Sequence, residues 1–241
     1  WRKAVKPGEI ILVIDVGGGT SDFSLIAVLE RGGNLELHRV AVGDHILLGG
    51  DNMDLTLAHV VARKLASEGK QLDPWQMRAL THACRSAKES LLSDATLQTH
   101  PIVVPSRGSK LIGGSIRTEL TQAEVQATLL EGFFPQVDAA ARPASRTRAG
   151  LTQLGLPYAQ DAGVTRHLAA LLGRQAGATA ELEGFAGTVN TGASFLHPTA
   201  VLFNGGVFKS GILTERTLAT LNSWLTAENA APARALSGAD M

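Results

Sequence analysis

Several features that mark particular protein classes are scarce in this sequence. Cys84 is the only cysteine in 241 residues, which excludes a disulfide framework and a cysteine metal cluster within the chain. Lysine and arginine total 22, as do aspartate and glutamate, so no basic surface for nucleic acid is indicated. The longest purely aliphatic run, from Ile10 to Ile14, is far shorter than the roughly 20 residues of a membrane span. We therefore expect no binding to nucleic acid or membrane, and a reducing, cytoplasmic location.

Signatures of common hydrolases are absent too. The seven histidines include no pair at metal-ligand spacing on one helix, and no serine lies in a nucleophile-elbow pattern. The first residues do not form the apolar stretch of a secretory signal. The chain starts with Trp1 rather than methionine, so we expect the fold to begin further upstream.

The pattern that is present begins with three predicted strands. They cover Ile10 to Asp15, Asp22 to Leu29 and Leu35 to Val42, and glycine-rich turns separate them. Such short turns predict an antiparallel meander.

Helices are predicted next. One apolar face runs from Met53 to Leu65, and a second runs from Leu80 to Leu91 in a helix that begins near Pro74. The segments 96–104 and 111–120 are predicted strands around a turn at 106–109. Thr121 and Glu124 form a predicted capping box at the start of a further helix.

The remainder of the chain is less regular. Residues 139–198 are rich in alanine, glycine and arginine; we expect a helix near Val164 to Leu172 and a loop over 183–197. A short buried strand is predicted at 199–203, followed by a helix that Thr214 caps. The order of elements indicates an α/β domain that carries an inserted helical and hairpin segment.

The strongest functional signal is the glycine-rich turn from Asp15 to Asp22. Three glycines let the backbone turn tightly, and successive N–H groups can converge on a phosphate. Asp15 ends a buried strand, so its carboxylate can reach a hydrated magnesium ion beside the phosphate. Two further paired glycines, Gly49-Gly50 and Gly205-Gly206, each precede a predicted helix. Each of these motifs alone is equally compatible with an ordinary turn.

Four segments, in order, resemble the later half of the nucleotide-binding domain of DnaK-type, 70-kDa heat-shock chaperones. The first is the phosphate loop, Ile11 to Asp22. The others are Gly43 to Asp54, Ala83 to Lys88 and Val201 to Gly206. The resemblance covers most of the chain outside 139–198, a stretch that we interpret as an insertion of a divergent bacterial subfamily.

The resemblance implies an actin-like ATPase fold. It implies a ribonuclease-H-like lobe formed by residues 1–48 and 118–241, with an inserted helix-plus-hairpin subdomain at 49–117. The ligand implied is ATP or ADP with magnesium. The expected partners are a first lobe and a downstream domain of the same protein, and a co-chaperone or exchange factor.

The resemblance also implies roles for individual residues. Asp15 would be catalytic, placing magnesium and the attacking water, and Asp22 would hold a cation through water. The other implied nucleotide-binding residues are Gly17, Gly18, Gly19, Thr20, Gly50, Arg85, Lys88, Gly205 and Gly206.

Some positions depart from the family pattern. Arg85 stands where relatives have a glutamate, and Glu89 stands where they have an arginine that stacks on the base; Val207 and Lys209 replace a serine and an arginine. We expect Arg85 to pair with Glu89, one helical turn away.

Three functions remain open from the sequence. The first is the second-lobe part of a chaperone-like ATPase, with no activity expected of this chain alone because only one phosphate loop is present. The second is a degenerate nucleotide-binding or scaffold module that does not hydrolyse ATP. The third is a sugar-kinase or filament member of the same superfamily.

Overall fold

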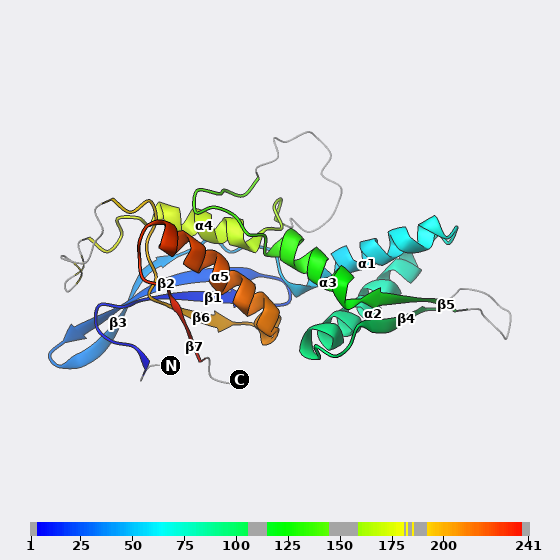
Figure 1. Ribbon diagram of the computed structural model, residues 1–241, viewed down its shortest axis with the longest axis horizontal. Coiled ribbons are helices and arrows are strands. Elements are labelled where there is room, and N and C mark those ends of the chain that lie inside the picture. The colour runs from blue at the N-terminus through cyan, green and yellow to red at the C-terminus, as the bar shows by residue number, and fades with distance from the viewer. Residues whose placement is uncertain are drawn as a thin grey trace.

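The computed structural model describes residues 4–105, 115–144, 159–180, 182, 185 and 192–237. These residues form a mixed α/β structure that is elongated in Figure 1, with a large sheet toward one end and a small two-stranded sheet toward the other. None of the helices in these ranges has the length and apolarity that crossing a bilayer requires.

The large sheet has five strands in the order β3-β2-β1-β6-β7. Its strands are β1 (Ile10–Val16), β2 (Ser21–Arg31), β3 (Asn34–Val42), β6 (Ala200–Asn204) and β7 (Arg234–Leu236). The β1/β2 and β2/β3 pairs are antiparallel, which confirms the predicted meander, whereas β1/β6 and β6/β7 are parallel. The parallel pairing brings the ends of β1 and β6 to the same edge of the sheet.

The two faces of this sheet bury different side chains. Along β1, Leu12 and Ile14 belong to the main core, which also takes in residues of α4 (Val164–Arg174) and α5 (Gly211–Ala227). Ile11 points to the other face and joins a smaller cluster. This alternation is the period of two that a strand imposes.

A helical region follows β3. It contains α1 (Gly50–Ser67) and α2 (Pro74–Ser93), which pack on each other, and the hairpin of β4 (Thr99–Val104) with β5 (Ile116–Thr121). The N–H groups at the start of α2 are satisfied by the Asp73 carboxylate, which accepts from Trp75 and Gln76 at 2.8 Å each. The predicted place of Pro74 in the first turn is confirmed.

The predicted capping box is also confirmed. Thr121 Oγ1 accepts from the Glu124 N–H at 3.1 Å, and the Glu124 carboxylate accepts from the Thr121 N–H at 2.8 Å. It opens α3 (Gln122–Ala127), which continues into η2 (Thr128–Phe133), a π-helical turn.

Three sequence predictions need correction. The α5 helix begins at Gly211 with Ser210 as its N-cap, and the Thr214 hydroxyl donates within the helix to Ser210 O at 3.2 Å, so Thr214 is not the cap. The segment 96–98 precedes β4, because Asp94 accepts from Thr96 and holds a turn there. The strand β7 was not predicted, since three residues are too few to show an alternating pattern.

Some predictions fall partly on other residues. The turn at 106–109, the start of the predicted strand at 111–114 and much of the loop over 183–197 lie outside the described residues.

Candidate functional site

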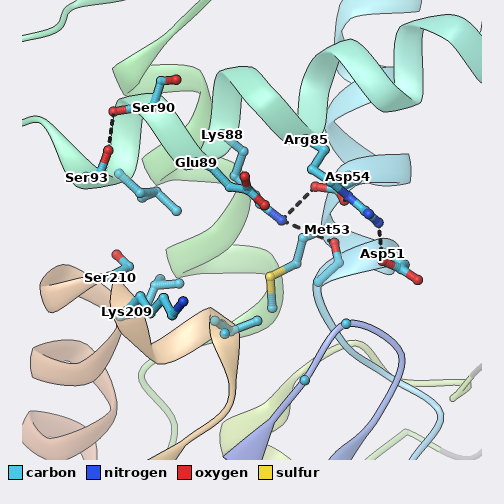
Figure 2. A pocket seen from close by; sticks show the side chains of 17 residues that line it. Asp51, Met53, Asp54, Arg85, Lys88, Glu89, Ser90, Ser93, Lys209 and Ser210 are labelled. Atoms are coloured by element: carbon cyan, nitrogen blue, oxygen red, sulfur yellow. Dashed lines mark hydrogen bonds and ion pairs between the residues drawn. The ribbon is translucent and has the colours of Figure 1, made fainter. Parts of the chain in front are cut away.

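A cavity of about 520 Å³ opens where β1, α1, α2 and the β6-to-α5 connection meet (Figure 2). Its lining combines glycines, charged side chains and a few apolar groups. These residues are Gly17, Gly18, Gly50, Asp51, Met53, Asp54, Arg85, Lys88, Glu89, Ser90, Leu92, Ser93, Gly206, Val207, Lys209, Ser210 and Leu213. The volume lies within the range of small-molecule sites, about 300–1,000 Å³.

The glycine-rich turn between β1 and β2 rests on the first turn of α1. Gly50 N–H donates to Gly17 O at 3.0 Å, and Asp51 N–H donates to Gly18 O at 2.7 Å. In a trans peptide the carbonyl and the following N–H point in opposite directions, so the N–H groups of Gly18 and Gly19 face away from α1. Within the described part of the chain, nothing accepts from the N–H groups of Gly18, Gly19 or Thr20. They are therefore available to an anion.

This close contact depends on the absence of a side chain at Gly49. A Cβ there would lie 2.6 Å from Gly18 O and 2.7 Å from Gly17 O. The backbone is extended at this position, with φ of −164°, so the requirement for glycine is steric. Asn52 Oδ1 accepts from the Gly49 N–H at 2.8 Å and completes the helix start.

The ends of β1 and β6 are fixed to each other by side chains and backbone. Asn204 Nδ2 donates to Asp15 Oδ2 at 2.7 Å, between residues that are partners in the parallel register. Gly205 follows with φ of +85°, and a Cβ there would lie 2.2 Å from Val16 O. Glycine is needed at this position for both conformation and space.

The predicted site residues divide into two groups. Gly17, Gly18, Gly50, Arg85, Lys88 and Gly206 line the cavity. Asp15, Gly19, Thr20, Asp22 and Gly205 are not among the lining residues but lie at the adjoining ends of β1, β2 and β6. The Asp22 carboxylate is engaged by His45, with Nδ1 2.7 Å from Oδ1.

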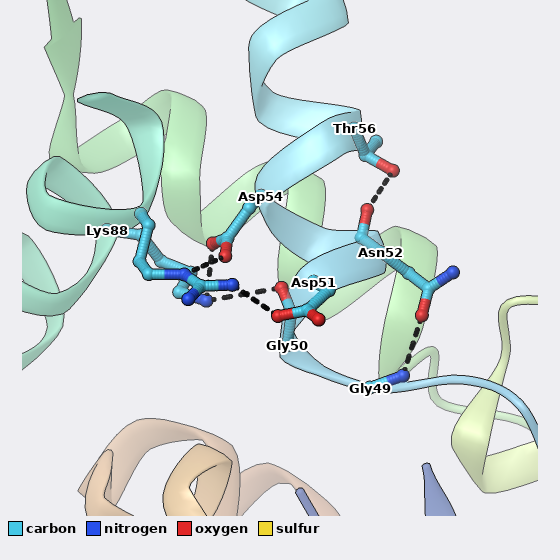
Figure 3. A network of polar contacts seen from close by, with 8 residues as sticks. Gly49, Gly50, Asp51, Asn52, Asp54, Thr56 and Lys88 are labelled. Carbon is cyan, nitrogen blue, oxygen red and sulfur yellow. Dashed lines mark hydrogen bonds and ion pairs between the residues drawn. The ribbon is translucent and has the colours of Figure 1, made fainter. Parts of the chain in front are cut away.

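A charged network joins α1 to α2 on one wall of the cavity (Figures 2 and 3). Lys88 Nζ lies 2.6 Å from Asp54 Oδ1, and Arg85 Nε donates to Asp54 Oδ2 at 2.8 Å. Arg85 also pairs with Asp51. The Asp54 and Lys88 side chains are only 1% and 9% exposed, so two buried charges neutralise each other. The expected pairing of Arg85 with Glu89 is not among the salt bridges of the described residues; Nε and Nη2 of Arg85 bind Asp54 and Asp51 instead.

The network also affects the neighbouring thiol. Burial, with a contribution from the Asp54 charge, raises the pKa of Cys84 to about 12. Cys84 is therefore a neutral, apolar-packed group under ordinary conditions.

The opposite wall comes from η3 (Gly206–Lys209) and the start of α5. Figure 2 shows Lys209 and Ser210 across the cavity from Glu89. Neither Glu89 nor Lys209 has a salt bridge within the described ranges, and the Ser210 hydroxyl is buried without a hydrogen-bond partner there.

Asp54 is the main site residue that the sequence analysis did not identify, although a signal existed. It lies one helical turn before Leu57 and Ala58, and two turns before Val61, all of which are buried. A carboxylate on the inward face of a helix needs a buried cation, and Lys88 occupies the corresponding inward position four residues after Cys84.

The residues near the glycine-rich turn do not form a complete metal site by themselves. In the described ranges, no three histidine, cysteine, aspartate or glutamate side chains are grouped as ligands for one metal ion. A cation here would depend on ligand phosphate and water oxygens for most of its coordination, which is how magnesium is commonly held.

A family model described as "Hsp70 protein" matches residues 3–144, which is more than half of the chain. The matched part contains the glycine-rich turn, α1 and α2, whereas η3 and α5 lie beyond it.

Proposed function

The chain belongs to the Hsp70 family of heat-shock chaperones, whose members bind ATP in an actin-like ATPase domain, and we propose that its cavity binds a nucleoside di- or triphosphate. The observation that carries the proposal is the arrangement of the glycine-rich turn. Its carbonyl oxygens are bound by the first turn of α1, and its N–H groups at Gly18, Gly19 and Thr20 remain available beside the cavity. A phosphate is the anion that such converging amides suit.

Each part of the nucleotide has a matching part of the cavity. Gly18, Gly19 and Thr20 would hold phosphate oxygens through their N–H groups, and Gly17, whose N–H donates to Thr20 O at 2.9 Å, would keep the turn closed. Lys88, whose charge is already balanced by Asp54, would donate to a neutral group such as a sugar hydroxyl. Arg85, Gly50, Gly205 and Gly206 would border the nucleoside, with the base between the α2 wall and Val207.

The residues are compatible with magnesium held through water. Asp15 and Asp22 carry the carboxylates nearest the turn in sequence, and each already has one oxygen bound by a neighbouring side chain. When bound, magnesium would neutralise phosphate charge and polarise the terminal phosphate for attack by water. Asp15 would orient a water molecule at the end of β1.

The strand order supports a ribonuclease-H-like lobe formed by 1–48 and 118–241. In that order only β2 runs against the other strands. The mutual packing of α1, α2, β4 and β5 supports an inserted unit at 49–117. We propose that a first lobe closes on this cavity and that a downstream domain and a co-chaperone or exchange factor respond to the closure. We also propose that the protein is cytoplasmic.

A nucleotide-binding module without hydrolysis is the second candidate. Glu89 favours it, because a carboxylate in the cavity cannot stack on a base as a guanidinium does. Membership of the Hsp70 family argues against the sugar-kinase and filament alternatives.

Backbone amide NMR would test nucleotide binding directly. Addition of magnesium and ADP to the chain should shift the amide resonances of Gly18, Gly19 and Thr20. The resonances of Gly132 and Gly211, which lie outside the lining, serve as internal controls. Saturable shifts in the turn alone support the proposal, and unchanged turn amides at millimolar nucleotide would refute it.

A further inference from the structure

Asp54 occupies an unusual place in the candidate site. Its carboxylate is buried on the inward face of α1, yet it contacts two cationic side chains from α2, Lys88 at 2.6 Å and Arg85 at 2.8 Å. Of these two cations, Lys88 is the one that is itself buried. A buried ammonium needs such a partner, since without one it would turn toward solvent or lose its proton.

The contacts of Lys88 leave it little freedom. Its ammonium has three donors. Among the described residues it forms an ion pair with Asp54 Oδ1 at 2.6 Å and donates a hydrogen bond to Gly50 O at 3.4 Å, while Oδ1 itself has no hydrogen-bond partner there. A donor therefore remains for a group in the cavity. The long lysine stem is flexible, so the place of the remaining donor is set by these acceptors rather than by the side chain itself.

The two groups that contact Lys88 lie in the first two turns of α1, and the first of these turns also holds the glycine-rich turn. The Gly50 carbonyl accepts from Lys88 (Figure 3), and the Gly50 N–H donates to Gly17 O. Asp54 lies one helical turn later on the same helix. The start of α1 therefore fixes the positions of both the Lys88 ammonium and the free amides of Gly18 and Gly19.

We propose that Asp54 is a positioning residue that fixes the Lys88 ammonium relative to the phosphate-binding turn, so that the sugar hydroxyls and the phosphates of one nucleotide are bound together. This inference rests on the proposed nucleotide site. Asp54 borders the cavity, but its side chain is only 1% exposed, so its carboxylate would act on the ligand through Lys88.

The test measures how much the sugar hydroxyls contribute to binding in each variant. Dissociation constants for ADP and for 2′,3′-dideoxy-ADP are compared by NMR titration in the wild-type chain, Asp54→Asn and Lys88→Met. The ratio measured is the dissociation constant of 2′,3′-dideoxy-ADP divided by that of ADP. A hydrogen bond from a charged donor to the sugar predicts a wild-type ratio of about ten. The ratio should fall to about one in Lys88→Met and in Asp54→Asn. Partial unfolding affects both ligands equally and cancels from the ratio.

Two further variants complete the design. Glu68→Gln removes the exposed partner of Lys70 just after α1, outside the cavity lining, and should keep the wild-type ratio. Asp54→Glu serves if Asp54→Asn fails to fold, because it keeps the negative charge but moves the carboxylate by one methylene. Since hydrogen bonds weaken steeply with distance, this variant should lower the ratio to about three.

The outcomes separate the two proposals. A wild-type ratio near ten that survives in both Asp54 variants, or a wild-type ratio near one, would overturn the positioning role while leaving nucleotide binding intact. If the wild-type chain binds neither nucleotide, the proposed function itself fails.

Discussion

The contact between Gly49 and the glycine-rich turn provides a sharp test of the site's construction. In Gly49→Ala, the added methyl would lie 2.6 Å from Gly18 O and 2.7 Å from Gly17 O. Alanine accepts an extended φ, so the cost arises from displacement and not from backbone strain. To reach an ordinary separation, α1 must move back by about 0.7 Å, because carbon–oxygen contacts are seldom shorter than about 3.3 Å. This movement stretches the hydrogen bonds from Gly50 and Asp51 to the turn.

The magnitude follows from those two hydrogen bonds. At about 0.5–1.5 kcal/mol each, their loss lowers the free energy of unfolding by about 1–3 kcal/mol. For a chain of this size, each kcal/mol of lost stability lowers Tm by about 2–4 °C, so we expect a decrease in Tm of about 2–12 °C. Thermal denaturation followed by circular dichroism measures this, and the nucleotide-induced amide shifts at Gly18 and Gly19 should weaken in parallel.

Two other glycines set the scale for this measurement. Gly19→Ala is the matched control, because no atom lies within 4 Å of its added Cβ, and its Tm should change by about 2 °C or less. Gly205→Ala should be the most destabilising of the three, since its Cβ would lie 2.2 Å from Val16 O and its φ is +85°. Equal effects at Gly49 and Gly19 would show that the packing of the turn on α1 is not as described.

Two further predictions concern titratable groups. Because burial and the Asp54 charge raise the pKa of Cys84 to about 12, alkylation at pH 8 should be negligible in the native state and complete in urea; rapid native labelling would contradict the packing of α2. Burial of Asp161 opposes its ionisation, but N–H donors from Ala144 and Gly163 together with Arg166 lower its pKa overall. Asp161→Asn should therefore lower Tm at pH 7. The difference in Tm from wild type should shrink as pH falls from about 4 through the folded-state pKa of Asp161. A difference in Tm that is constant with pH would contradict this charge-based stabilisation.

Much of the fold could be predicted because local patterns and tertiary packing agree. The β-branched run at Ile10 to Ile14, the apolar face of Leu80 to Leu91 and the Thr121 capping box each gave an element at the expected place. The short strand β7 could not be predicted, because three residues show no alternating pattern and its partner β6 lies about 30 residues earlier; Asn222 binds Ala233, next to β7, through both of its side-chain polar atoms. The start of α5 was misplaced because Ser210 and Thr214 are both plausible caps by type. The decision between them comes from η3, which ends at Lys209.

The candidate site shows the same division between local and distant information. Glycine runs indicated where the backbone turns, and Gly17, Gly18, Gly50 and Gly206 do line one cavity. Sequence alone did not show that the carbonyl groups of the turn accept hydrogen bonds from α1, because that contact joins segments more than 30 residues apart. Without it, the direction of the free N–H groups could not be inferred.

The partners of the charged residues on α2 determine the net charge of this wall of the cavity. Helix spacing within α2 suggested Glu89 as the partner of Arg85. In the structure, Asp54 and Asp51 on α1 bind it instead, because Asp54 is already buried and needs counter-charge from α2. Two aspartates against Arg85 and Lys88 leave this wall close to neutral, and Glu89 then contributes a negative charge that Asp54 cannot offset. A nucleobase on this side would therefore meet a carboxylate, whereas a phosphate at the glycine-rich turn would meet unpaired amides. In the proposed binding mode, the base end and the phosphate end of the cavity therefore depend on different residues, so a substitution at one end need not alter the other.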